Sequence, residues 1–171
     1  TPTPAFVENS GDGITIEADR AELGKTGGAK LRGEVRVSMQ NQQIAADAID
    51  VTNGNQQLNA TGNVRFRSSQ AELDASSAEI SADSREATFE DTEFRLYDTN
   101  GVFSARGSAA KLETSEQGDA QLANVLFTGC PPDAEGWELS AEKIELDEES
   151  GSGYARKVKL NFYGVPLVYL P

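Results

Sequence analysis

An eight-residue stretch that the chain repeats decides the fold: Ile16-Glu17-Ala18-Asp19-Arg20-Ala21-Glu22-Leu23. Similar stretches begin at Ile44, Leu73, Phe103 and Leu139, at spacings of 28, 29, 30 and 36 residues, and the copy at Phe103 carries two extra residues. Each copy alternates apolar and polar residues, which is typical of a half-buried strand, and leads through a turn-rich segment to a second alternating strand. Self-similarity at a nearly fixed period indicates a repeat architecture.

The alternation slips by one residue inside each copy. Ile16 and Ala18 share one parity, whereas Ala21 and Leu23 share the other, so a strand that buries both pairs must bulge at 19–20. The same slip falls at 47–48, 76–77 and 142–143. Strands that bend at the same place in every repeat pass from one sheet to a facing one. The sequence therefore predicts an all-β protein, an elongated β-jellyroll of two opposed antiparallel sheets built from about five repeats.

Three segments follow from this pattern. The jellyroll is expected at residues 14–162, after an extended segment at residues 1–13. The last stretch, 163–171, departs from the repeat and is unusually apolar and aromatic. It is either a final edge strand or a connector to a further, membrane-proximal domain.

Composition excludes several classes of function. The chain has 171 residues, 15 Lys and Arg against 28 Asp and Glu, and a net charge of −13, which disfavours binding to nucleic acid or to an anionic bilayer. It has no His, which excludes Ser-His-Asp hydrolysis and most zinc sites. Its carboxylates fall in turns or at outward positions, where nothing raises a pKa for general acid catalysis. We expect no catalytic residue, metal or cofactor.

The single cysteine, Cys130, precedes two prolines at the end of a strand. One cysteine cannot close an internal disulfide, so Cys130 is either an inert thiol or the partner of a cysteine elsewhere. The interior also has two interpretations, a filled core and an apolar groove. Periodicity alone favours a filled core, because filled interiors predominate in proteins, but small inward residues such as Ala18, Ala46 and Ala75 would also leave an apolar groove.

Three features together resemble the N-terminal periplasmic domain of the LptD family, the lipopolysaccharide (LPS) assembly proteins of the Gram-negative outer membrane. They are the OstA-type repeats, the segment Phe127–Trp137 (FTGCPPDAEGW) and the closing segment Phe162–Pro171 (FYGVPLVYLP). The repeats are shared by the whole LptA, LptC and LptD group, so the other two segments carry the specific part of the resemblance. The resemblance implies a periplasmic location at the outer membrane and a disulfide between Cys130 and the C-terminal β-barrel, with residues 163–171 leading to that barrel. The chain departs from a common family pattern in lacking a second cysteine near its N-terminus.

The resemblance also implies a function in LPS transport. The domain would accept acyl chains in an apolar groove from an LptA-like bridge and pass them to its own barrel, which holds an LptE-like lipoprotein plug. Exposing one acyl chain of about 12 carbons to water costs roughly 9 kcal/mol, so such a lipid needs a continuous apolar path. Inward parity gives the candidate groove lining, which is Ile16, Ile44, Val64, Phe66, Leu73, Phe94, Phe103, Phe127, Leu139 and Phe162.

An exposed edge is expected to receive the bridge protein by strand addition. The candidate docking edge is Ile14, Thr15, Ile16, Glu17 and Ala18. Two alternatives stay open. The chain could be a soluble LptA-like bridge, or a β-repeat scaffold or adhesion module with a filled core that binds no lipid.

Overall fold

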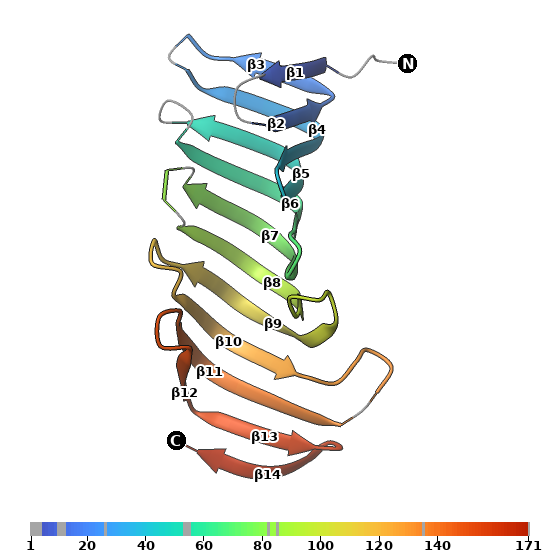
Figure 1. Cartoon of the computed structure of the whole chain (residues 1–171), viewed down its shortest axis with the longest axis vertical. Coiled ribbons are helices and arrows are strands. Elements are labelled where there is room, and N and C mark those ends of the chain that lie inside the picture. Colours follow the sequence, from blue (N-terminus) through green and yellow to red (C-terminus); the bar gives the residue numbers. More distant parts are fainter. Residues whose placement is uncertain are drawn as a thin grey trace.

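The computed structural model describes residues 5–9, 13–25, 27–52, 56–81, 83–84, 86–134 and 136–170, with only the backbone described for 5–9. Within this part of the chain there are fourteen β-strands and no helix (Figure 1). The strands are β1 (Ala5–Asn9), β2 (Ile14–Ala18), β3 (Arg20–Leu23), β4 (Ala29–Met39), β5 (Gln42–Thr52), β6 (Gln57–Arg67), β7 (Ala71–Ser81), β8 (Ala87–Tyr97), β9 (Phe103–Thr114), β10 (Ala120–Thr128), β11 (Trp137–Asp147), β12 (Ser152–Arg156), β13 (Val158–Phe162) and β14 (Val165–Leu170).

All these strands belong to one antiparallel sheet. Its order is β1-β2-β4-β5-β6-β7-β8-β9-β10-β11-β13-β14, while β3 pairs with β4 and β12 pairs with β11. Most neighbours in the sheet are neighbours in sequence, so the molecule grows by stacking hairpins along its long axis (Figure 1). The all-β, antiparallel prediction is confirmed. The two opposed sheets are the two arms of this one sheet, because β4 to β11 each continue from one arm into the other.

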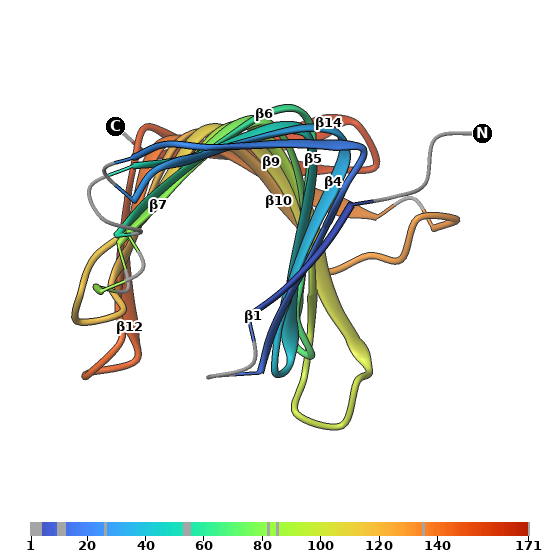
Figure 2. The ribbon, with the colours of Figure 1, turned by 90° about the horizontal axis from the view of Figure 1, so that it is seen from above.

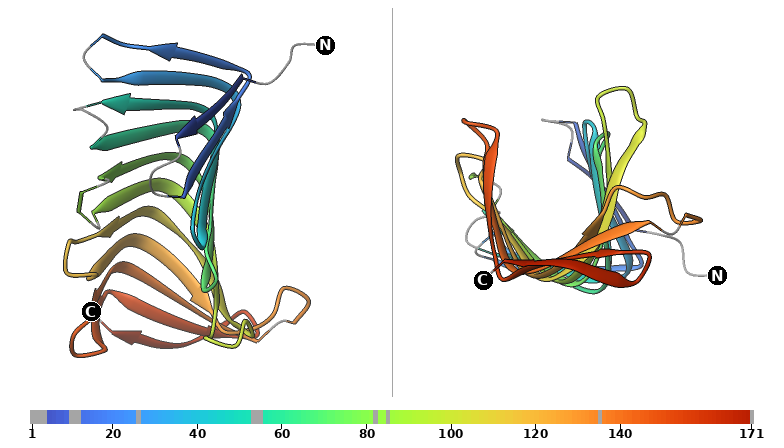
Figure 3. Two further views of the ribbon diagram at one scale, coloured as in Figure 1. Left: turned by 45° about the horizontal axis from the view of Figure 1, so that its top comes forward. Right: turned by 90° about the horizontal axis from the view of Figure 1, so that it is seen from below.

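The sheet is bent into a U when it is viewed along its long axis (Figures 2 and 3). The ladder of paired residues is interrupted once near the middle of the long strands, for example between Ala45 and Ala48 of β5 and between Thr61 and Val64 of β6. The bends predicted from the parity slips fall at these interruptions. Asp19 separates β2 from β3, and the other slip positions, 47, 76 and 142, are each skipped by the ladder.

The partner strand at each bend supplies a residue with left-handed backbone. These residues are Glu34, Asn63, Asp91, Asn124 and Lys157, with φ between 43° and 51°. Glycine precedes two of them, and Gly62 has a φ of +75°. A Cβ on Gly62 would lie 2.5 Å from Oδ2 of Asp47, and the Asn63 side-chain amide donates a 2.8 Å hydrogen bond to that same oxygen. The bulged backbone therefore packs directly on an acidic side chain of the neighbouring strand.

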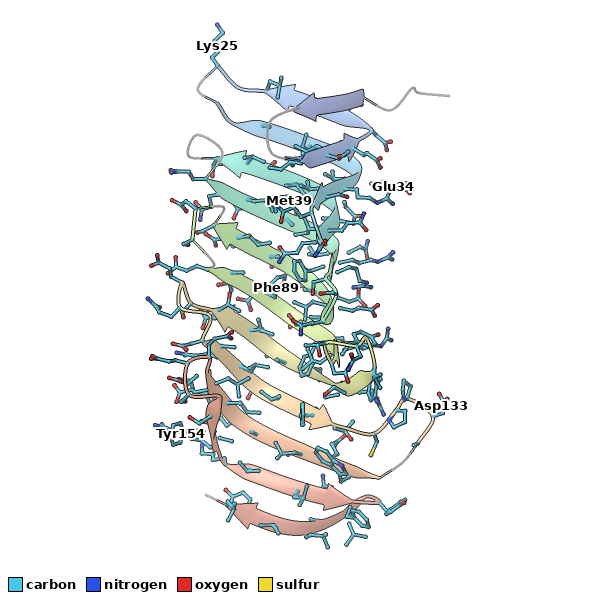
Figure 4. The ribbon with its side chains drawn as sticks, in the orientation of Figure 1. Lys25, Glu34, Met39, Phe89, Asp133 and Tyr154 are labelled. Atoms are coloured by element: carbon cyan, nitrogen blue, oxygen red, sulfur yellow. The ribbon has the colours of Figure 1, made fainter. Side chains whose placement is uncertain are left out.

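The core lies on the concave face of the bend, because a single curved sheet can enclose side chains only between its arms. Alternation along each strand sends one set of side chains there, and Figure 4 shows Phe89 inside the bend and Glu34 outside it. Ile49 and Val35 are fully buried. The buried cluster is continuous from Ala18 on β2 to Val125 on β10.

The sheet extends past both predicted boundaries of the jellyroll. β1 pairs with β2, and β14 pairs with β13 across a bulge next to Pro166, which itself lies opposite Asn161. Main-chain pairing holds an edge strand whether or not its side chains alternate, and proline is tolerated at such an edge. The described parts of 1–13 and 163–171 are therefore strands of the sheet, and whether the second leads to a barrel stays a prediction.

Candidate functional site: the concave apolar face

An unbroken row of paired inward residues runs along one arm from β2 to β14. Every member is apolar or glycine, and in order they are Ile16, Val37, Ile44, Phe66, Leu73, Phe94, Gly107, Phe127, Leu139, Leu160 and Val168. Seven of the ten candidate lining residues stand in this row, which are Ile16, Ile44, Phe66, Leu73, Phe94, Phe127 and Leu139. Side-chain parity along the repeats was sufficient to predict that these seven residues share one face of the sheet.

The other three candidates lie beside the row. Val64 is one inward position nearer the bend and is 1% exposed. Phe162 pairs with Trp137 near the C-terminal end of the sheet and is 47% exposed. Phe103 is set apart, because a register shift places it opposite Tyr97 and the two rings meet edge to face at 6.5 Å. Phe103 therefore belongs to the end of the β8–β9 hairpin rather than to the row.

A second inward row on the opposite arm was not among the candidates. Its members are Ala21, Leu31, Ile49, Ala60, Ala78, Phe89, Leu112, Leu122, Ile144 and Ala155. The signal for it was present in the sequence, since the parity slip that turns the strand also turns Ala21 inward. These two rows face each other across the bend and make up most of the concave surface.

The middle of the concave face is filled by side chains. Phe66 on one arm meets Phe89 on the other, with ring centroids 6.0 Å apart and planes at 62°. This packing agrees with the filled-core alternative for that part of the molecule. Aromatic residues gather further along the same face, where the rings of Phe127 and Trp137 are 5.8 Å apart.

The apolar surface becomes accessible toward the C-terminal end of the sheet. Inward residues there are largely exposed, with Phe162 at 47%, Val168 at 44% and Leu170 at 57%. Figure 3 shows this end, where β12 and β14 are the last strands of the sheet among the described residues. Exposed apolar surface of this extent marks a contact site for a lipid or for more protein.

The convex face is polar and carries cross-strand ion pairs. Arg36 pairs with Glu17 at 3.0 Å and Arg67 pairs with Asp74 at 2.9 Å. Two surface depressions, of about 280 and 450 Å³, are lined mainly by outward residues of this kind, so neither is an apolar groove. Across the described ranges, no group of three His, Cys, Asp or Glu side chains is placed to hold a metal. The same ranges contain no helix that is long and apolar enough to span a membrane.

Cys130 is a free, partly exposed thiol in the segment between β10 and β11. Its backbone N–H donates to the Thr128 hydroxyl at 3.1 Å, and its carbonyl accepts from Nε of Arg106 at 3.0 Å. Hydrogen bonding from Thr128, then from the Trp137 backbone, lowers the pKa of the thiol, which favours the reactive thiolate. A Cβ on Gly136 would lie 2.5 Å from Sγ, so the segment closes tightly around the sulfur.

The candidate docking edge at 14–18 is not a free edge. β2 pairs with β4 on one side and with β1 on the other, in register from Ala5 opposite Ala18 to Asn9 opposite Ile14. Among the described strands, the N-terminal edges with a partner on only one side are β1 on one arm and β3 on the other. The sequence placed the edge one strand too far in, because pairing of β1 depends on main-chain hydrogen bonds that leave no mark in the alternation.

Comparison with known proteins adds the family to this geometry. Residues 15–152 match the model of the family described as "LptA/(LptD N-terminal domain) LPS transport protein". The LPS-assembly protein LptD of Shewanella denitrificans is 32% identical over 158 residues, and that of Nitrosococcus oceani is 28% identical over 158 residues. Each alignment covers 92% of this chain, so the chain spans about one fifth (20% and 21%) of the length of these relatives.

One solved structure is also similar. It is LptH of Pseudomonas aeruginosa, described as the LptA-homologous periplasmic component of the LPS transport device. Its identity is 17% and its TM-score is 0.34 over 83% of this chain and 80% of that chain, a likeness that carries no argument by itself. The family match covers most of the chain and describes transport proteins rather than enzymes. The chain therefore belongs to the family of LPS transport proteins formed by LptA and the N-terminal domain of LptD.

Proposed function

We propose that the concave face carries the acyl chains of LPS along the long axis of the sheet. The observation that supports this most directly is the unbroken inward row from Ile16 to Val168, in which no member is polar or charged. Each buried CH₂ is worth about 0.8 kcal/mol, so a lipid with several acyl chains moves through water only along such a continuous apolar surface. Aliphatic and aromatic contacts without specific polar partners also let the chains slide.

The charged head group would remain outside the bend. The chain has a net charge of −13, and its acidic side chains lie on the convex face and in the turns, where they would repel phosphate groups. Divalent cations would screen this repulsion. The acyl chains alone would enter between the arms, displacing side chains of the filled middle as they move toward the exposed residues of the C-terminal end.

A direction of transfer is part of this proposal. The curated relatives that the chain matches are about five times longer than the chain. We infer that an LptA-like bridge docks at the N-terminal edge and that LPS passes toward the C-terminal remainder, an outer-membrane barrel with an LptE-like plug. In that arrangement Cys130 forms the disulfide that fixes the domain to the barrel, on the periplasmic side of the membrane.

Site-specific photocrosslinking to LPS tests the proposal. A photoreactive residue replaces Phe66 or Phe127 on the inward face, and Arg65 or Arg36 on the outward face serves as the matched control. Adducts at the two inward positions alone would support an apolar LPS track. Adducts at outward positions with equal yield would contradict it.

The contact between Phe66 and Phe89 also agrees with a second function, that of a β-repeat scaffold with a filled core. The same experiment separates the two functions. A folded chain that gives no adduct at any of the four positions would establish the scaffold.

A further inference from the structure

We propose that Phe66 and Phe89 form a gate midway along the concave face, which must open before an acyl chain can pass. This inference rests on the proposed LPS transport and adds a regulated step to it. Phe66 belongs to the inward row of one arm and Phe89 to the inward row of the other. Their edge-to-face contact at 6.0 Å is therefore a bridge between the arms rather than a contact along one strand.

The strand between them explains why the rings meet. β7 lies between β6 and β8, and its inward residues beside the bend are Ala75 and Ala78. These small side chains leave a space on the concave side of β7, which large side chains of the neighbouring strands can fill. Phe89 is 4% exposed and Phe66 is partly buried, so the ring pair occupies the space between the arms at this point.

A second observation concerns a buried hydroxyl three residues along β8 from Phe89. Thr92, on the same strand as Phe89, is 1% exposed, and its hydroxyl has no hydrogen-bond partner among the described residues. The corresponding inward position beside the bend on other strands is Val35, Val64 or Val125. A buried hydroxyl without a partner disfavours the closed state, and opening would give this hydroxyl access to water or to an ester oxygen of the lipid.

The gate predicts a difference in timing between its two sides. Ile44 on β5 and Phe127 on β10 stand in the same inward row on opposite sides of it. LPS that has reached one of these positions must open the gate to reach the other. The two positions are therefore expected to acquire photocrosslinked LPS at different rates, whichever end the lipid enters.

The test measures how fast LPS adducts form at the two positions in the purified 171-residue chain, which buries a core of its own. Photoreactive residues at Ile44 and at Phe127 are exposed to purified LPS and sampled over time. Phe66→Leu and Phe89→Leu each keep an apolar side chain but lose the ring pair. We therefore expect the ratio between the faster and the slower rate of adduct formation to fall about threefold to tenfold in these variants. Phe103→Leu is the matched control, because it also removes a ring pair, that with Tyr97 at 6.5 Å, but Phe103 lies at the end of the β8–β9 hairpin, outside the inward row.

Thr92→Val supplies a variant that keeps its fold. It removes the unpartnered hydroxyl with little change in shape, so it should raise the melting temperature and widen the gap between the two rates. Equal rates in the unmodified chain, or the same difference between the two rates in Phe66→Leu, Phe89→Leu and Phe103→Leu, would overturn the gate and leave LPS transport standing. Absence of adducts at both positions in every variant would overturn the gate and the proposed function together.

Discussion

Single residues at the bend decide whether the sheet can turn. Gly62 combines a φ of +75° with the close approach of the Asp47 carboxylate. Most L residues adopt such a backbone only at a cost, and here a Cβ would also overlap the carboxylate. The same combination occurs at Gly33, where an added Cβ would overlap the Asp19 carboxylate. The turn between the arms therefore requires glycine at these positions for two independent reasons.

We predict that Gly62→Ala lowers the free energy of unfolding by about 2–3 kcal/mol, since left-handed strain and displacement of Asp47 add together. Denaturant unfolding followed by circular dichroism measures this. Gly101→Ala is the control, because Gly101 has a φ of +77° but nothing within 4 Å of its added Cβ. It should lose only about 1 kcal/mol. Equal losses in both variants would show that the contact with Asp47 contributes nothing.

At the scale of strands, the free edges at the two ends of the sheet differ in what they are expected to bind. β3 and β12 lie on the same arm, and each pairs with only one neighbour. Leu23 on β3 is 75% exposed and Tyr154 on β12 is 73% exposed. An unpaired edge presents backbone donors and acceptors that a partner strand can extend.

These edges give a matched test of the docking proposal. A photocrosslinker at Leu23 is expected to capture an LptA-like partner, whereas the same probe at Tyr154 is not, because the partner adds strands at the N-terminal end. The measurement is the adduct yield on denaturing gels with the purified partner. Capture at Tyr154 in preference to Leu23 would reverse the proposed polarity of the stack.

The strands also show which features of the fold could be predicted from the sequence and which could not. The repeat and its parity slip predicted the bends at Asp47 and Ser76, because burial of one face leaves a period of two in the sequence. The left-handed residues on the partner strands, such as Asn63, were missed, although Gly62-Asn63 inside an alternating strand is a signal for a bulge. β1 was missed because main-chain pairing imposes no pattern on side chains.

At the candidate site, the inward row shows what side-chain parity can predict and what it cannot. Parity placed Ile44 and Phe127 on one face, and the structure aligns them in one row. Parity cannot show that Phe66 and Phe89, which are 23 residues apart in sequence, meet across the bend. That contact depends on how sharply the sheet turns and on the small size of Ala75, which are properties of the folded chain.

At the scale of the whole molecule, the chain is a bent sheet with an apolar inside and an acidic outside. Its interior is tightly filled in the middle and becomes accessible toward the C-terminal end, where Phe162 and Leu170 are exposed. Under the proposed function, such a path would bind no group strongly along its length, since its surface offers apolar area but almost no polar partners. Movement of lipid would then depend on supply at one end and removal at the other.

The most direct test of an LPS track on the concave face uses the single tryptophan as a probe. Trp137 shares the inward face of β11 with Leu139, whereas Leu126 points outward from the adjacent β10 and is 44% exposed. Quenching by acrylamide is measured with and without purified LPS, in the natural chain and in a variant that combines Trp137→Phe with Leu126→Trp. The account predicts that LPS shields the natural Trp137 from acrylamide and leaves the outward tryptophan of the variant unshielded. Equal shielding of the two positions, or shielding of the outward one alone, would contradict it.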